Sequence, residues 1–265
     1  EISECLVGSE MCIRDRSMSD FLMLVIVDKT DNNYSFLPIN RDTMSEVRLI
    51  QDDGTGVATA ELQLCTAHWY GGNAEQSCAN TVESISKLFG GLKINGYYAI
   101  PMDAIPKLNH SVGGVTVTLL EDFQDIDRQM KKGETLALSD EQAYRYIHDR
   151  YGVGDEKNTS RMKRQQQYME AFFTKAKEKA KSDKAYVGQL FREFEQTATT
   201  NLTAKKISGL TNRLIKGTQK GFFEIKGTSK IGKALGDGID HAEFYPDKES
   251  IIDVMTKIYG LKKRE

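Results

Sequence analysis

The chain has 265 residues, of which 39% are hydrophobic and 28% are charged, an ordinary composition for a globular protein that can bury a full core. Its 36 Lys and Arg residues nearly balance 38 Asp and Glu residues, and the net charge of −2 excludes a global positive field of the kind that holds nucleic acid. The longest clean apolar run, residues 21–27, is far shorter than the ~20 residues that a membrane-spanning helix needs.

The first 17 residues differ from the rest of the chain. They show no clear hydrophobic period, and they hold two of the four cysteines, Cys5 and Cys12. Residues 1–17 resemble the translation of sequencing-adapter DNA, so we interpret them as an artefactual or non-native segment and set them aside from the fold. The alternative is a genuine but irregular N-terminal segment. We therefore predict a single domain over residues 18–265.

Two strands follow this segment. The continuous apolar run at residues 21–28 is rich in β-branched residues and predicts a strand buried on both faces. A turn signal at residues 31–33 separates it from a second strand at 34–39, which favours a hairpin. The second strand ends in the polar cluster 40–43, and strand ends are where sheet proteins place ligand groups. Residues 46–59 indicate an exposed loop.

Helices and strands alternate along the rest of the chain. Residues 61–70 remain ambiguous between helix and strand, and Ser139 with Gln142 forms a capping box at a helix start. The hydrophobic spacing predicts helices at 73–89, 102–110, 139–148, 186–196, 204–215 and 247–259, and strands at 96–101, 115–120 and 222–226. This alternation is typical of an α/β fold.

Residues 146–167 predict the end of one helix, a glycine-bearing loop and the start of a second helix. Three polar residues could cap that second helix: Asn158, Thr159 or Ser160. Five side chains then share one face at three- and four-residue spacing: Arg161, Arg164, Gln165, Tyr168 and Phe172.

The basic residues at this helix start are electrostatically unusual. A helix N-terminus carries a partial positive charge and normally prefers acidic residues, yet Arg161, Lys163 and Arg164 lie there. A bound anion would explain them, because free N–H groups and arginine forks both suit phosphate. The alternative is a solvated basic helix start with Asp155 and Glu156 as local counter-charges.

Five motifs, in this order and at these separations, resemble the LytR-CpsA-Psr family. They are Ser19–Val25, Pro38–Thr43, Val112–Val117, Asp140–Arg150 and Asn158–Gln166. The resemblance covers residues 19–175, with a looser continuation over 176–265, and smaller features suggest a clostridial type of member.

The resemblance implies a central mixed β-sheet flanked by α-helices, with a hydrophobic groove for a lipid. It also implies a membrane-anchored enzyme on the extracytoplasmic face of Gram-positive bacteria, although no anchor is present in this chain. Such enzymes bind an undecaprenyl-pyrophosphate-linked glycan, such as a teichoic acid or capsule precursor. Using Mg²⁺, they transfer its glycan-phosphate to a peptidoglycan hydroxyl.

By motif position, Asp20 resembles a metal-binding aspartate, and Arg41 resembles the pyrophosphate-binding arginine of the family signature. Arg150, Arg161 and Gln165 resemble the remaining phosphate-contacting residues, so we predict that all five converge on one site. Taken singly, each has a structural alternative. Asp20 could flank a strand, Arg41 could form a local salt bridge, and Arg150 could contact carbonyls at a helix C-terminus.

Three further residues complete the predicted site. Asp42 would assist catalysis or brace Arg41, while His148 and Arg164 would bind substrate. His148 stands where the family usually has an arginine, and a histidine carries a full charge only near or below its ordinary pKa of ~6.5.

A second departure from the family concerns the metal. The family's domain begins with a strand that ends in another metal-binding aspartate, and here Glu10 is only a superficial stand-in. The chain could therefore be truncated and impaired. This departure supports an alternative hypothesis, a non-catalytic binder of polyprenyl phosphate or anionic cell-wall glycan. A transcriptional regulator is disfavoured by the near-neutral charge and the lack of a helix-turn-helix pattern.

The cysteines and histidines are scattered without metal-ligand spacing. The extracytoplasmic location that the resemblance implies favours a disulfide between Cys65 and Cys78, because disulfides persist there. Two buried free thiols are the alternative.

Overall fold

The computed structural model describes residues 3–9, 18–51 and 55–260, with no side-chain description for residues 3–9 and 57. Its centre is a mixed six-stranded sheet with the strand order β10-β3-β2-β1-β6-β9. These strands are β1 (Ser3–Ser9), β2 (Phe21–Val27), β3 (Tyr34–Ile39), β6 (Ile94–Pro101), β9 (Thr199–Thr200) and β10 (Gln219–Phe222). The β1/β6 and β3/β10 pairs are parallel, and the other neighbours are antiparallel.

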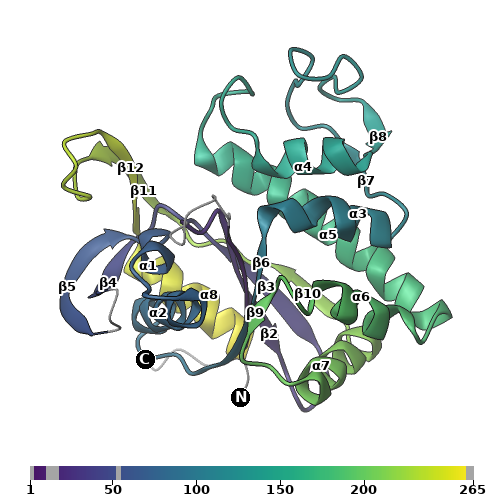
Figure 1. Cartoon of the computed structure of the whole chain (residues 1–265), viewed down its shortest axis with the longest axis horizontal. Coiled ribbons are helices and arrows are strands. Elements are labelled where there is room, and N and C mark those ends of the chain that lie inside the picture. The colour runs from purple at the N-terminus through teal and green to yellow at the C-terminus, as the bar shows by residue number, and fades with distance from the viewer. Residues whose placement is uncertain (1–2, 10–17, 52–54, 261–265) are drawn as a thin grey trace.

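Helices cover both faces of this sheet (Figure 1). The helices α2 (Ala74–Leu88) and α8 (Lys248–Tyr259) pack on one face, and α5 (Asn158–Ser182) and α7 (Ala204–Lys216) pack on the other. The shorter helices are α1 (Thr66–Trp69), η1 (Met102–Ala104), α3 (Ile105–Ser111), α4 (Asp140–His148) and α6 (Tyr186–Phe194). None of the helices within the described ranges is long and apolar enough to cross a membrane. The predicted α/β fold with a central mixed sheet is confirmed.

The strand β2 shows why the sheet is covered on both faces. Side chains alternate along a strand, so Leu22 and Leu24 face the α2/α8 layer, while Met23 and Val25 face the α5/α7 layer. All four are fully buried. A strand with two covered faces needs a continuous apolar run, which is the pattern that the sequence contains. The hairpin with β3 is also confirmed, and its turn places Asn32 in the left-handed region at φ 61°.

The N-terminal segment requires a correction. Its backbone at Ser3–Ser9 forms β1, which lies between β2 and β6 in the middle of the sheet. Setting residues 1–17 aside from the fold was therefore wrong for this stretch, because β2 and β6 both need a hydrogen-bonding neighbour there. Glu10 lies outside the described residues. The division into residues 1–17 and 18–265 stays a prediction.

The exposed loop predicted at residues 46–59 is also wrong. The strands β4 (Met44–Ile50) and β5 (Gly56–Gln63) form an antiparallel hairpin there. Val47 and Leu62 are buried in a small satellite cluster, so apolar and polar residues do alternate along these strands. Two more hairpins pair β7 (Thr116–Thr118) with β8 (Thr135–Ala137), and β11 (Gly227–Gly232) with β12 (His241–Pro246). The strand predicted at 222–226 lies earlier, as β10.

The two helix starts near the candidate site differ from each other. The capping box of α4 is confirmed: the Ser139 hydroxyl accepts from the Gln142 amide, and the Gln142 side chain accepts from the Ser139 amide. The predicted cap of α5 is wrong. Lys157 occupies the cap position and makes no side-chain cap bond, because the Asn158 side chain is used in a different network.

The predicted disulfide is wrong, and the alternative of two buried free thiols is confirmed. Cys65 precedes α1 and lies with its Sγ atom 4.0 Å from Sδ of Met18. Cys78 lies on the buried face of α2. The two side chains belong to different packing environments, and sequence position alone does not show this.

These thiols should resist alkylation while the protein is folded. Burial raises the pKa of Cys65, although the neighbouring Arg41 opposes this shift, and burial raises the pKa of Cys78 to about 12. We expect peptide mapping by mass spectrometry to find both unmodified in native buffer and both modified in denaturant without reductant. Modification that requires a reductant would instead reveal a disulfide.

Candidate functional site

The candidate site forms where β2 begins, β3 ends and α5 begins. The register of the β2–β3 hairpin pairs Leu22 with Ile39. Continued by two residues, this register places Asp20 opposite Arg41. The first turn of α5 brings Arg161 to the same point, so three segments of the chain meet.

The carboxylate of Asp20 is the centre of this cluster. Its Oδ1 atom contacts Nη1 of Arg41, and the same atom lies 3.2 Å from Nη1 of Arg161. Asp20 and Arg161 are each 4% exposed. Two guanidinium groups thus share one carboxylate oxygen in a buried place, which leaves an excess of positive charge.

A network of two asparagines holds Arg161 in this position. Oδ1 of Asn158 accepts hydrogen bonds from Nε and Nη2 of Arg161, at 3.2 and 2.9 Å. Nδ2 of Asn158 donates to Oδ1 of Asn40 at 2.8 Å, and that oxygen also accepts from the backbone amide of Asp42 at 2.9 Å. The start of α5 is therefore fastened to the loop that carries Arg41 and Asp42. The sequence did not lead us to predict Asn40 or Asn158 as site residues. The available signal was their position, because each lies in the same motif as one of the predicted arginines.

Arg150 completes the positive side of the cluster. It lies in the loop after α4, is half-buried, and its guanidinium stacks over the Tyr151 ring at 4.5 Å. Its charge acts on both Asp42 and Arg161. Burial lowers the pKa of Arg161, with Asp20 opposing the shift and Arg41 and Arg150 adding to it. An arginine remains charged at neutral pH in any case, so the lowered pKa of Arg161 records mainly its burial, to which the nearby like charges add.

Asp42 lies at the edge of the cluster with its side chain 14% exposed. Its Oδ1 atom is 4.0 Å from Nε of Arg41. Burial raises the pKa of Asp42, and Arg41, Arg161 and Arg150 act against that shift. A carboxylate with a raised pKa is a stronger base than an ordinary aspartate, which suits it to accept a proton.

Gln165 is placed differently from the prediction. It is 1% exposed, and its Nε2 atom donates to the carbonyl of Ile147 at 3.2 Å. Its Oε1 atom is buried without a hydrogen-bond partner among the described residues. Gln165 thus binds the last turn of α4 and keeps one buried acceptor available.

Arg164 was predicted to bind substrate, and the structure gives it another position. It is 1% exposed and donates to the carbonyls of Tyr146 and Asp149, at 2.6 and 2.5 Å. Its Nε atom lies 2.7 Å from Oε2 of Glu121, and its guanidinium lies 5.0 Å from the centre of the Phe123 ring. Every side of this guanidinium meets protein, so Arg164 joins α5 to α4 and does not face the cluster.

His148 was also predicted to bind substrate. Its ring stacks on Tyr144 at 4.9 Å, and its Nδ1 atom lies 2.9 Å from Oδ1 of Asp149. The carbonyl oxygen of His148, not its ring, contacts Arg161 at 3.5 Å. The residue therefore supports the cluster through its backbone.

The described residues do not fit the Mg²⁺ site that was predicted at Asp20. The Oδ1 atom of Asp20 is already engaged by two guanidinium groups, which repel a cation. No group of three or more His, Cys, Asp or Glu side chains arranged to hold a metal occurs among them. Magnesium favours octahedral oxygen ligands, and a single carboxylate shared with two arginines does not supply them.

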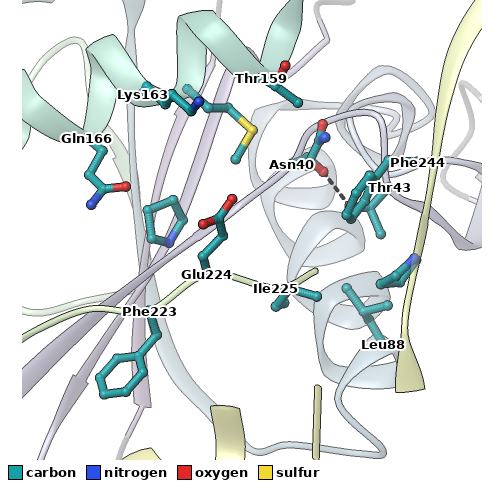
Figure 2. A pocket seen from close by; sticks show the side chains of 13 residues that line it. Asn40, Thr43, Leu88, Thr159, Lys163, Gln166, Phe223, Glu224, Ile225 and Phe244 are labelled. Carbon is teal, nitrogen blue, oxygen red and sulfur yellow. Dashed lines mark hydrogen bonds between the residues drawn. The ribbon is translucent and has the colours of Figure 1, made fainter. Parts of the chain in front are cut away.

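A cavity of about 100 Å³ is lined in part by Asn40 (Figure 2), whose side chain also accepts the hydrogen bond from Asn158. It is lined by Pro38, Asn40, Thr43, Leu88, Thr159, Met162, Lys163, Gln166, Phe223, Glu224, Ile225, Phe244 and Pro246. Its wall thus mixes apolar side chains with a lysine, a glutamate and amides.

Solved structures with the same fold are numerous. One is TagV of B. subtilis, with 21% identity, a TM-score of 0.74, and coverage of 98% of this chain and 96% of that chain. A second is the protein gbs0355 of Streptococcus agalactiae, with 21% identity, a TM-score of 0.75, and coverage of 100% and 89%. A third is TagT bound to LI-WTA, with 19% identity, a TM-score of 0.69, and coverage of 98% and 89%. No curated protein matches the sequence.

The sequence profile of the LytR_cpsA_psr family matches residues 6–257, which is most of the chain and includes Asp20, the three arginines and Asp42. The chain therefore belongs to the LytR-CpsA-Psr family.

Proposed function

We propose that this protein transfers a glycan-phosphate from an undecaprenyl-pyrophosphate-linked precursor to a peptidoglycan hydroxyl. The family attaches glycopolymers to the cell wall. The TagT structure with LI-WTA supports a glycopolymer-linked donor for this chain as well. The location that we propose is the extracytoplasmic face of the membrane, with which the family is associated.

The observation that carries this proposal is the convergence of Arg41 and Arg161 on Asp20, with Asp42 beside Arg41 and the charge of Arg150 acting on Asp42. Three positive charges face two negative charges, and two of the arginines are held against one carboxylate oxygen. Crowded like charges cost folding free energy unless an anion compensates for them. A diphosphate supplies that anion, and arginine forks bind phosphate oxygens in two-point contacts.

The chemistry follows from this charge arrangement. The acceptor hydroxyl attacks the phosphorus that bears the glycan, and its proton passes to the carboxylate of Asp42. The bond between that phosphorus and the bridging oxygen breaks, and undecaprenyl phosphate leaves. Positive groups that stabilise charge on the phosphoryl oxygens are the main requirement of such a transfer, and Arg41 and Arg161 are held in place for it.

Magnesium and the lipid groove stay predictions from the resemblance. Asp20 is engaged by Arg41 and Arg161, so in the proposed transfer these arginines neutralise the phosphoryl charge. Phe36 stacks on Phe173 at 4.6 Å and on Phe222 at 4.8 Å, and these rings fill the space between the sheet and α5. A polyprenyl tail would have to displace this aromatic layer or run along the outside of α5.

The proposal is tested by incubating the protein with a lipid-linked glycan donor and peptidoglycan fragments, with added Mg²⁺ and with a chelator. Glycan-phosphate attached to the fragments, found by mass spectrometry, is the expected result. Donor binding without transfer under every condition would replace the proposal with the alternative of a non-catalytic glycan binder.

Asp42→Asn should lower the transfer rate by about 10² or more, the usual contribution of a positioned base. Because the folded pKa of Asp42 is raised above 3.8, the unfolded chain loses this proton first as the pH rises. The carboxylate therefore lowers stability above that pH, and the free energy of unfolding of Asp42→Asn should exceed that of the wild type at neutral pH but not near pH 3.

Rate measurements and urea unfolding from pH 3 to 8 test both parts of this prediction. In the wild type, the acid limb of the rate profile should lie above the ordinary range of an aspartate. An Asp42→Asn variant that transfers at the wild-type rate would remove Asp42 from the mechanism.

A further inference from the structure

The cavity beside Asn40 contains polar side chains that the fold does not use. The side chains of Lys163, Gln166 and Glu224 face it, and within the described part of the chain none of these side chains has a hydrogen bond or ion pair. Lys163 and Glu224 come from α5 and from the segment after β10, and both keep exposure to solvent. Figure 2 shows Lys163 above Glu224, with Gln166 to the left of both. Donors and acceptors are thus presented to a ligand.

This cavity shares a wall with the candidate catalytic loop. Asn40 lines it and also binds the backbone amide of Asp42. Phe244 lines it and donates its backbone amide to the carbonyl of Asp42 at 2.8 Å. A molecule in the cavity would therefore adjoin the loop that carries Asp42 without touching its carboxylate. This is the place expected for a sugar next to the one whose hydroxyl gives its proton to Asp42.

The lining chemistry indicates the class of molecule. One ammonium and one carboxylate balance each other, so the cavity does not favour a polyanion. Phe223, Ile225 and Phe244 supply apolar surface, on which the C–H face of a sugar ring packs. A single water needs about 10–15 Å³. A cavity of about 100 Å³ can therefore hold a group the size of one sugar ring, but it is too small for a long polyprenyl tail.

We propose that this cavity is the subsite for a sugar of the acceptor glycan, with Lys163, Gln166 and Glu224 binding its hydroxyl and amide groups. The inference rests on the proposed function, since it names where the acceptor of that reaction binds. The acceptor sugar would then bind between α5 and the segment after β10. The diphosphate would bind at Arg41 and Arg161, on the other side of Asn40.

The double variant Lys163→Met/Glu224→Gln tests this assignment. The exposed pair Lys132→Met/Glu134→Gln, in the turn before β8, serves as the matched control. We expect the cavity variant to raise the KM for a soluble peptidoglycan fragment about tenfold, and to leave unchanged the KM for the donor and the slow hydrolysis of the donor without acceptor. An unchanged acceptor KM, or a raised donor KM, would overturn the inference.

Calorimetric binding of a peptidoglycan disaccharide separates this inference from the proposed function. If the wild type binds the disaccharide and the cavity variant does not, the subsite stands even where no transfer occurs. If the wild type transfers glycan-phosphate but both proteins bind the disaccharide equally, the proposed function stands and the subsite is wrong. Failure of the wild type to bind the disaccharide likewise overturns the subsite. Thermal unfolding of both double variants checks that they are folded.

Discussion

Arg161→Ala should reduce the transfer of glycan-phosphate by at least about 10²-fold, because it removes a fixed positive group from the place where phosphoryl charge develops. Arg161 is 4% exposed, lies 3.2 Å from Asp20 and is held by two hydrogen bonds to Asn158. The guanidinium of Arg161 is already in position before the substrate binds. Its loss should therefore lower kcat more than the affinity for the lipid-linked substrate. Steady-state kinetics with a lipid-linked donor measure the effect.

The fold should tolerate this change. Asp20 keeps its contact with Arg41, and removal of one guanidinium relieves the repulsion from Arg41 and Arg150. Against this, Oδ1 of Asn158 loses its donors, which costs about 1–3 kcal/mol. We expect a net loss of stability below about 2 kcal/mol. Arg161→Lys, which keeps the charge but not the fork, should recover only part of the rate. A fully active Arg161→Ala variant would remove the arginine cluster from the mechanism.

Arg164→Ala should instead unfold the protein readily, with a loss of about 3–5 kcal/mol, the usual cost of breaking a buried ion pair from one side. The guanidinium of Arg164 is the donor to the carbonyls of Tyr146 and Asp149, and its partner Glu121 is mostly buried. All three acceptors lose their partner at once. Urea unfolding gives the free energy, and a double-mutant cycle with Glu121→Gln gives the part that belongs to the ion pair.

The two arginines form a matched pair, because they lie about one turn apart on α5 and differ only in what faces them. We expect Arg161→Ala to lose activity and keep stability, and Arg164→Ala to lose stability. A stable Arg164→Ala variant with a raised donor KM would restore the substrate-binding role that was predicted from the sequence.

The sequence by itself determined the elements whose signals are local. The apolar runs of β2 and β3, the turn between them and the capping box of Ser139 and Gln142 need only neighbouring residues. It also determined the family, because five motifs in register cover much of the chain. The pairing of Asp20 with Arg41 follows nearly as directly, since a tight hairpin fixes the register of its two strands.

Only the tertiary structure determined which residue each buried side chain contacts. Helical spacing places Arg161, Arg164 and Gln165 on one stripe, but only the packing of α4 against α5 directs Arg161 to Asp20 and Arg164 to Glu121. Packing likewise moved Asn158 from a helix cap to a hydrogen bond with Asn40, and placed Cys65 and Cys78 in separate environments. Local periodicity specifies which face of a helix is buried, whereas the partner on that face is chosen by segments distant in the sequence.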